Sequence, residues 1–289
     1  MAGTKGKGST CAFTRSFLSA HGLRTGFPKR VGLYTSPHLQ SIRERIQIDG
    51  EPIAEDLFTR YFFEVWERLV SAESSQLTGI ERKPRYLQLL ALLAFHTFIK
   101  ENVDAAVFET HHGGHYDTTN VIRKPVVTGI TSLGMDHIAE LGPTIKDIAW
   151  HKAGIFKPNV LAYSVMQDAG PSEVLRQCAA ERNTELKFVS ASSTLPSDRG
   201  ALSVPVQRLN CSLALQMASS FVLLKNPGHI LDEDDVSKGI DGFSWIGRFE
   251  VINKGTSQWF LDGAHNQLSL SQAAGWFSKN ANESSNVPK

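Results

Sequence analysis

The sequence has few cysteines, no long apolar run and almost no net charge, and each of these absences excludes a class of protein. Three widely spaced cysteines, Cys11, Cys178 and Cys211, are typical of reduced thiols rather than of a disulfide framework. The longest strongly apolar stretch, 87–99, is far shorter than the ~20 residues that a membrane-spanning helix needs. Because 30 lysines and arginines nearly balance 29 acidic residues, we expect no nucleic-acid partner and no membrane insertion.

The order of apolar segments predicts the fold class. Helical patterns cover 9–20, 54–71, 86–101, 144–153 and 172–182, and another begins near Asn210; short strand-like segments cover 31–35, 46–48, 104–108, 126–131, 159–164 and 185–189. The segments 104–108 and 126–131 are almost continuously apolar, as in strands buried on both faces of a parallel sheet. The alternation therefore predicts an α/β fold with a doubly wound, mostly parallel sheet. The polar residues 280–289 are expected to be disordered.

A glycine-rich segment at the start of the chain carries the first candidate site, Gly3-Thr4-Lys5-Gly6-Lys7-Gly8-Ser9-Thr10. Its glycines leave backbone N–H groups accessible, its lysine can reach phosphate oxygens, and its hydroxyls lie where a helix begins. The extra glycine between Lys7 and Ser9 departs from the usual P-loop string. The pattern predicts a phosphate-binding loop, and a flexible linker is the alternative.

Polar residues follow two of the predicted strands. Ser36 follows the strand 31–35 and could offer a hydroxyl to a metal, although a simple proline turn is the alternative. Glu109 ends the strand 104–108, and a carboxylate there is suited to Mg²⁺, which prefers oxygen ligands. The histidines of the following loop, His111, His112 and His115, could suggest zinc, but no cysteine or fixed fourth ligand accompanies them.

Further candidates lie downstream. Asp136 and His137 follow the strand 126–131, at the same predicted sheet edge. Lys152 lies near the end of a predicted helix. A lysine there is usually exposed to solvent, and its positive charge stabilises the C-terminus of the helix. Arg248 and Asp262 flank two later strand-like segments, and either could bind part of a nucleotide or simply belong to a turn.

The order of these motifs resembles that of the folylpolyglutamate synthases, a family of the Mur-ligase superfamily. The strings are Gly-Thr-Lys-Gly-Lys-Gly-Ser, Thr-Ser-Pro-His-Leu, Glu-x-x-x-Gly-Gly-x-Tyr-Asp-x-Thr-Asn, Gly-x-Asp-His, Lys-Ala-Gly-Ile and Leu-Asp-Gly-Ala-His. The resemblance extends from Ala2 to about Phe277, and the His-His-Gly-Gly form of the acidic loop is most similar to the fungal enzymes. Any one string would be weak evidence, whereas six in the same order are specific.

The resemblance implies an enzyme that uses MgATP to phosphorylate a folate carboxylate, which the amine of L-glutamate then attacks to form a γ-linked amide. It implies an ATP site made by Gly3, Thr4, Lys5, Gly6, Lys7, Gly8, Ser9, Thr10, Asn210, Arg248, Asp262 and His265. It also implies magnesium ligands Ser36, Glu109 and His137. Lys7, His137 and Lys152 are the catalytic residues it implies, and Lys152 matches a lysine that becomes carbamylated in the family.

The resemblance also predicts how the chain is organised. Residues 1–246 would form a P-loop ATP-binding domain that lacks its first strand, and 247–289 would begin a C-terminal ligase domain. We expect this chain alone to have little or no ligase activity and to be a monomer. We expect the protein to be cytoplasmic, and a mitochondrial form is also compatible with the sequence. Dihydrofolate synthase and a non-catalytic P-loop nucleotide-binding protein are the alternatives.

Overall fold

The computed structural model describes residues 1–71, 83–196, 200–265 and 267–285, and two sheets form its centre. The strands are β1 (Val31–Tyr34), β2 (Ile46–Ile48), β3 (Glu51–Pro52), β4 (Ala105–Phe108), β5 (Thr128–Ile130), β6 (Ala162–Val165) and β7 (Leu186–Val189). One sheet has the order β3-β2-β1-β4 and the other β5-β6-β7. All pairs are parallel except β1 with β2 and β2 with β3, which confirms a mostly parallel arrangement.

Met1 and Ala2 lie between the two sheets and join them. The N-terminal nitrogen of Met1 donates to the carbonyl oxygen of Phe108 at 2.8 Å, while Ala2 forms a parallel bridge with Ile130. These two residues therefore lie between β4 and β5. Two residues of extended backbone are enough to satisfy the polar groups that face them.

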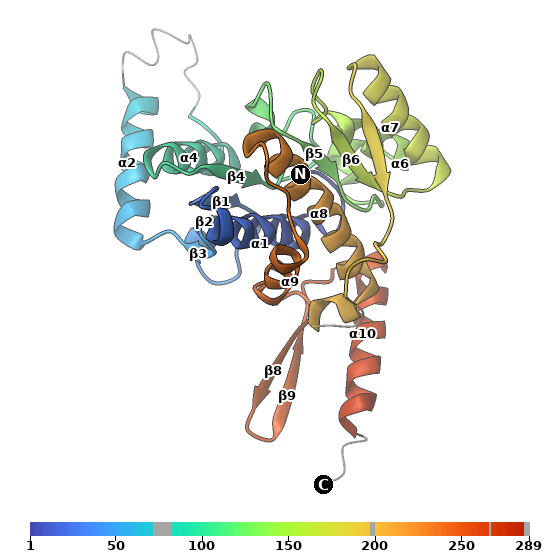
Figure 1. The fold of residues 1–289 in the computed structure, drawn as a ribbon. Coiled ribbons are helices and arrows are strands. Elements are labelled where there is room, and N and C mark those ends of the chain that lie inside the picture. Colours follow the sequence, from blue (N-terminus) through green and yellow to red (C-terminus); the bar gives the residue numbers. More distant parts are fainter. Residues whose placement is uncertain (72–82, 197–199, 266, 286–289) are drawn as a thin grey trace.

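Helices cover both faces of the joined sheets, so the predicted doubly wound arrangement is confirmed (Figure 1). On one face lie α1 (Lys7–Thr25) and α8 (Pro205–Lys225); on the other lie α4 (Tyr86–Lys100), α6 (Ile145–Ala153) and α7 (Ala169–Glu181), with α2 (Glu55–Val70) packed on α4. Two neighbouring residues of β1 illustrate this arrangement. Leu33 packs in the hydrophobic core that includes residues of α1 and α8, whereas Tyr34 packs in the core that includes residues of α2 and α4. Side chains of a strand alternate between the two faces of a sheet.

Several predicted boundaries shift. Helix α1 begins at Lys7 rather than residue 9 and continues to Thr25. Helix α8 begins at Pro205, before Asn210, because proline suits the first turn of a helix. The expectation of disorder from residue 280 is wrong as far as Ser285, where α10 (Gln267–Ser285) ends; residues 286–289 lie outside the described part.

The remaining helices are short. They are η1 (Ile42–Arg45), η2 (Thr118–Val121), α5 (Ile138–Leu141), η3 (Gly200–Ser203) and α9 (Glu233–Asp241).

The C-terminal segment forms a hairpin and a helix apart from the central sheets (Figure 1). Strands β8 (Glu250–Lys254) and β9 (Ser257–Leu261) pair with each other in an antiparallel sheet. Edge-to-face contacts between aromatic rings join this hairpin to α10. The ring centroid of Trp276 lies 5.5 Å from the ring centroids of Phe249 and of Phe260. The division into domains at 246/247 stays a prediction.

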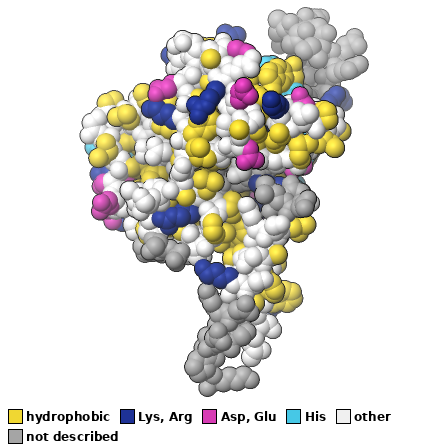
Figure 2. Space-filling view, turned by 90° about the vertical axis from the view of Figure 1, so that its right-hand side faces the viewer, with side chains coloured by type: hydrophobic (Ala, Val, Ile, Leu, Met, Phe, Trp, Pro, Cys, Tyr) yellow, Lys and Arg dark blue, Asp and Glu magenta, His cyan; other side chains and the backbone are white. Residues whose placement is uncertain are grey.

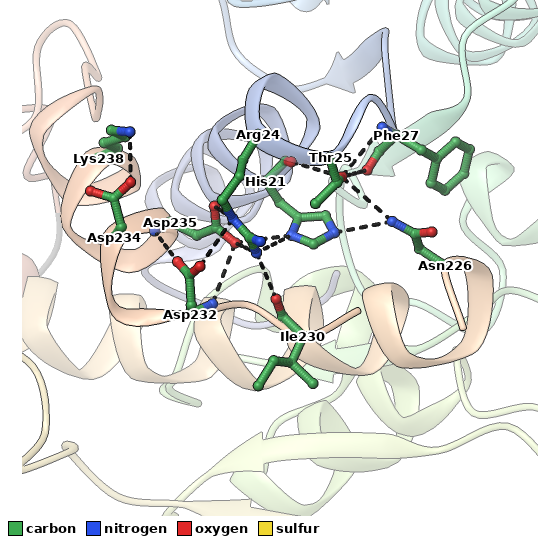
Figure 3. A network of polar contacts seen from close by, with 10 residues as sticks. All are labelled: His21, Arg24, Thr25, Phe27, Asn226, Ile230, Asp232, Asp234, Asp235 and Lys238. Carbon is green, nitrogen blue, oxygen red and sulfur yellow. Dashed lines mark hydrogen bonds and ion pairs between the residues drawn. The ribbon is translucent and has the colours of Figure 1, made fainter. Parts of the chain in front are cut away.

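A buried polar network anchors α9 to α1 (Figure 3). His21 Nδ1 lies 2.9 Å from Asp235 Oδ2, and Arg24 Nη2 donates to the same oxygen at 2.6 Å. Asn226, at the end of α8, contacts the other nitrogen of the His21 ring at 3.3 Å. The network therefore joins three helices and also contacts the loop that precedes α9, where Arg24 donates to the carbonyl oxygen of Ile230.

The outer surface carries mixed charge. On the face shown in Figure 2, basic and acidic side chains are interspersed with hydrophobic ones, in keeping with the balanced composition. None of the helices in the described residues is both long enough and apolar enough to cross a membrane.

Candidate functional site

The predicted phosphate loop lies where the chain leaves the sheet and enters α1. Gly6 is the N-cap of α1 with φ 86°, and no side chain caps this helix end. The first N–H groups of a helix have no partner within the helix, so an uncapped N-terminus is suited to an anion. A Cβ atom at Gly6 would lie 2.3 Å from Asn210 Oδ1, and one at Gly3 would lie 1.8 Å from Thr131 Oγ1. Both positions therefore require glycine.

Thr4 and Thr10 hold this loop in place. The hydroxyl of Thr4 donates to the carbonyl oxygen of Gly134 at 3.0 Å and accepts from the N–H of Gly134 at 3.1 Å. The hydroxyl of Thr10 donates to the carbonyl oxygen of Gly6 at 2.8 Å. These contacts preorganise the loop before any ligand binds.

Glu109, Ser36 and Lys7 come together beside the loop. Glu109 is only 3% exposed, and its Oε2 accepts hydrogen bonds from the Thr35 hydroxyl and, at 3.2 Å, from the N–H of Ser36. Its Oε1 lies 3.7 Å from Lys7 Nζ. The parallel pairing of β1 with β4 brings these residues together, because it aligns Tyr34 with Phe108 at the carboxyl ends of both strands. The structure thus places a carboxylate, a serine and a lysine at one point.

His137 lies on the loop that follows β5, near the histidines that follow Glu109. It is exposed, with φ 50° at the N-cap of α5, and its ring centroid is 5.0 Å from that of His112. Burial and the neighbouring His137 lower the pKa of His112. Among the residues that the structure describes, no three His, Cys, Asp or Glu side chains are grouped closely enough to hold a metal. The magnesium assignment to Ser36, Glu109 and His137 stays a prediction, and the oxygen donors of Glu109 and Ser36 fit that ion.

The other loop histidines have structural contacts. His111 Nε2 lies 2.6 Å from the Tyr34 hydroxyl, and its Nδ1 lies 3.5 Å from Asp117. Burial would raise the pKa of Asp117, but the hydrogen bonds of His111 and Thr119 to its carboxylate lower it to about 2. His115 stacks on Trp150 at 5.0 Å. These contacts hold the loop around Glu109 in shape.

Lys152 is buried against the phosphate loop instead of being solvated. The side chain is 3% exposed, and Nζ donates to the carbonyl oxygen of Gly3 at 2.8 Å. Burial, with repulsion from Lys7, lowers the pKa of Lys152 to about 7. A large fraction of this lysine is therefore a neutral, nucleophilic amine near neutral pH.

Residues of the C-terminal segment reach the same loop. Lys5 Nζ donates to His265 Nε2 at 3.0 Å and lies 3.6 Å from Asp136. Burial lowers the pKa of Lys5, although Asp136 opposes the shift. Asp262 accepts from the N–H of Phe249 at 2.9 Å. The stretch 262–265, which follows β9, thus carries His265 to the phosphate loop.

Arg248 and Asn210 complete the contacts. A Cβ atom at Gly263 would lie 2.0 Å from Arg248 Nη1. The guanidinium of Arg248 therefore packs directly against the backbone of the stretch 262–265, which ends in His265. Asn210 is 2% exposed, and its Oδ1 has no hydrogen-bond partner among the described residues. This orphaned oxygen lies beside Gly6, where a ligand donor could satisfy it.

One cavity of about 830 Å³ unites the candidate residues. Its lining includes Gly6, Lys7, Ser36, Glu109, His137, Asn210, Arg248, Asp262 and His265. Lys152 is not among the lining residues and lies behind the loop, which it contacts through Gly3. The volume is within the range of small-molecule sites in proteins.

Two residues near the cavity escaped the sequence interpretation. Asp117 orders the histidine loop by accepting the N–H groups of His111 and His112 at 2.9 and 3.1 Å. The sequence did contain a signal for this role, because an aspartate shortly after a Gly-Gly pair often accepts backbone hydrogen bonds and thereby orders a loop. Arg15 lines the cavity from the middle of α1, and a charged residue between Phe13 and Phe17 was the only signal for it.

Comparison with known proteins finds relatives in sequence and in structure. No family model matches the sequence. The chain is 43% identical over 285 residues to folylpolyglutamate synthase of Neurospora crassa, covering 96% of this chain and 53% of that protein. It is 45% identical over 290 residues to a probable folylpolyglutamate synthase of Schizosaccharomyces pombe, covering 98% of this chain and 56% of that protein.

A solved structure agrees with these relatives. The structure described as an FPGS–AMPPCP–folate complex matches with a TM-score of 0.82 at 27% identity, covering 96% of this chain and 70% of that one. The chain spans about half the length of the curated relatives that it matches. Over nearly its whole length, the chain is therefore homologous to the folylpolyglutamate synthases.

Proposed function

We propose that this chain carries the ATP-binding part of a ligase that adds L-glutamate in γ-linkage to folates. The observation that carries the proposal is the single cavity in which an uncapped helix N-terminus, the Lys7–Glu109 pair and Arg248 meet. The solved relative described as a complex with AMPPCP and folate supports both substrates. Its bound AMPPCP, an ATP analogue, suits the phosphate loop.

The proposed reaction has two steps. A folate γ-carboxylate oxygen attacks the γ-phosphorus of ATP and displaces ADP, which gives an acyl phosphate. The amine of glutamate then attacks the acyl carbon, releases phosphate and loses a proton. In both steps Lys7 and the N–H groups of 6–9 neutralise phosphate charge.

The remaining residues position the reactants. Arg248 would bind phosphate oxygens, because a guanidinium binds them with two parallel hydrogen bonds. Asp262 and His265 would hold the stretch 262–265, which lies against Arg248. Asn210 Oδ1 would accept a hydrogen bond from the nucleotide. Glu109, Ser36 and His137 would hold magnesium, which supplies positive charge at the phosphates when bound.

Carbamylation of Lys152 forms part of the proposal. The neutral amine attacks the carbon of CO₂ and loses a proton, which leaves an N-carboxylate in place of an ammonium. The pKa of about 7 supports this step because it supplies the neutral amine. The buried position beside the loop would then present a negative group towards the cation site.

Glutamate incorporation tests the proposed function. The chain is incubated with MgATP, labelled glutamate and either tetrahydrofolate or dihydropteroate, and AMPPCP binding is measured in parallel. Label transferred to tetrahydrofolate supports the proposal, whereas transfer to dihydropteroate alone indicates dihydrofolate synthase. AMPPCP binding with no transfer to either acid is the result we expect of this chain alone, which spans about half the length of its relatives. The same result for a version extended to the full length of those relatives would favour the non-catalytic nucleotide-binding alternative.

The proposal extends to the setting of the protein. Its three cysteines are free and buried, which supports a reducing compartment such as the cytoplasm. We propose a monomer, because all the residues assigned to the site come from one chain.

A further inference from the structure

Arg15 is a mostly buried arginine to which no described residue is bonded. It is only 7% exposed, and among the described residues it forms no hydrogen bond or ion pair that would satisfy its guanidinium. The guanidinium nitrogens are not among the fully buried side-chain atoms that lack a partner, and Arg15 lines the large cavity, so these nitrogens can be reached from the cavity by a ligand. A mostly buried cation gains from an anionic partner, which a ligand in the cavity can supply. Burial lowers the pKa of Arg15, and the nearby Glu51 carboxylate opposes that shift without forming an ion pair.

The guanidinium lies in the same cavity as the phosphate loop, farther along α1. The cavity follows one face of this helix, with Arg15, Ser19 and Leu23 spaced four residues apart. The turn between β2 and β3 forms the opposite wall, and a Cβ atom at Gly50 would lie 2.6 Å from Arg15 Nη1. From the rise of a helix, Arg15 is roughly 12 Å along the axis from Lys7.

The chemistry of the proposed reaction identifies the missing partner. A γ-linked glutamate tail uses only its γ-carboxyl groups for amide bonds, so each residue keeps a free α-carboxylate. When the last γ-carboxylate lies at Lys7, the α-carboxylates of earlier residues extend away from the phosphate loop. We propose that Arg15 binds an α-carboxylate of the γ-glutamate tail of the substrate. This assignment rests on the proposed function.

The geometry of arginine suits this role. A guanidinium binds a carboxylate through two parallel hydrogen bonds, and a buried pair of this kind is stronger than an exposed one. Ser19, one turn along α1, lines the same wall. Glu51 is exposed and competes for the guanidinium as an internal carboxylate. The site therefore favours substrates that already carry more than one glutamate.

Binding measurements with two folates test the assignment. Pteroyl-tri-γ-glutamate and pteroylmonoglutamate are titrated against the full chain with Mg²⁺ and AMPPCP. Arg15→Gln is expected to weaken triglutamate binding about tenfold or more and monoglutamate binding less than threefold. Glu51→Gln should strengthen triglutamate binding, and the exposed Arg60→Gln is the matched control that should change neither.

Thermal unfolding separates binding from folding. Without ligand, Arg15→Gln should melt at the same temperature as the wild type or higher, because it removes an unpaired buried charge. A lower melting temperature with equal loss of both folates would overturn the assignment and show a structural role. Unchanged triglutamate binding would also overturn it.

A third probe distinguishes this site from the proposed function. If the wild-type chain binds neither folate, the proposed function fails, and free γ-linked triglutamate and inorganic phosphate are titrated instead. Triglutamate binding that Arg15→Gln abolishes retains the carboxylate site. Phosphate binding that depends on Arg15, or no dependence on Arg15 for either probe, rejects it.

Discussion

The side-chain nitrogen of Lys152 donates a hydrogen bond to the carbonyl oxygen of Gly3 at 2.8 Å. This contact joins the end of α6 to the phosphate loop, although 149 positions separate the two residues in sequence. It explains why a lysine that the helix pattern would leave in solvent is instead buried beside the candidate site. Removing its charge should therefore affect both stability and chemistry.

The first prediction concerns pH and Lys152. Its pKa is about 7 in the folded chain, against 10.5 for a free lysine. Between these values the unfolded state binds more protons, so the free energy of unfolding should rise as pH increases from about 7 to about 10. Below pH 7 the cost of the buried charge is fully present. Lys152→Met should flatten this rise and stabilise the chain near pH 7.

Urea unfolding at pH 7 and pH 9.5 measures this effect. Lys146→Met, on the exposed side of the same helix, should keep the wild-type dependence. Equal pH dependence in the wild type and Lys152→Met would show that Lys152 is not the group responsible.

The second prediction concerns the phosphate loop. Gly6→Ala would place a Cβ atom 2.3 Å from Asn210 Oδ1 at a φ of 86°. We expect a loss of about 1–3 kcal/mol in stability from backbone strain, together with at least tenfold weaker AMPPCP binding, measured by isothermal titration calorimetry.

Gly228 provides the control, because its φ is 91° and nothing lies within 4 Å of an added Cβ atom. Gly228→Ala should cost similar backbone strain and leave AMPPCP binding unchanged. If the two variants bind AMPPCP equally, the loop geometry does not determine nucleotide binding.

The third prediction concerns Glu109. Glu109→Gln removes the negative charge beside Lys7 while retaining an acceptor for Thr35. The enhancement of AMPPCP binding by Mg²⁺ should fall about tenfold or more, because a neutral amide is a weaker magnesium ligand. Binding of AMPPCP without Mg²⁺ should be retained or strengthened, since Lys7 is released.

The measurement is an AMPPCP titration at several Mg²⁺ concentrations. Glu64→Gln, at a helix surface outside the cavity, is the matched control and should keep the magnesium effect. An unchanged magnesium effect in Glu109→Gln would place the ion elsewhere.

The fourth prediction concerns the network in Figure 3. Burial would raise the pKa of Asp235, but hydrogen bonds from Arg24 and His21 lower it overall. Its stabilising effect is therefore present above the normal aspartate pKa and lost as pH falls through the lower folded value. Asp235→Asn should destabilise the chain by about 3 kcal/mol at pH 7, because His21 loses its buried carboxylate partner and Arg24 keeps only its pair with the more exposed Asp232.

Chemical denaturation at pH 7 and at pH 3 measures this loss. Asp234→Asn, in an exposed pair with Lys238, should change stability by less than about 0.5 kcal/mol. A similar effect of both substitutions would show that burial of the network does not matter.

Local sequence predicted most of the fold correctly, since hydrophobic periodicity reports which faces of an element are buried. The strand at Ile46–Ile48 and the helix at 86–101 show this, with only small shifts at their ends. Boundaries such as the start of α8 were missed, because helix ends depend on caps and on contacts that a local pattern does not contain.

The motif sequence by itself determined that a glycine loop begins α1 and that acidic and polar residues end the strands. Tertiary structure alone decided which of these residues meet. The pairing of β1 with β4 placed Ser36 at Glu109, and the packing of α6 on the loop buried Lys152 and lowered its pKa. Packing around α1 left the Arg15 guanidinium facing the cavity, with no bonded partner among the described residues. Burial and proximity depend on contacts between distant segments, and a linear pattern of residue types does not specify them.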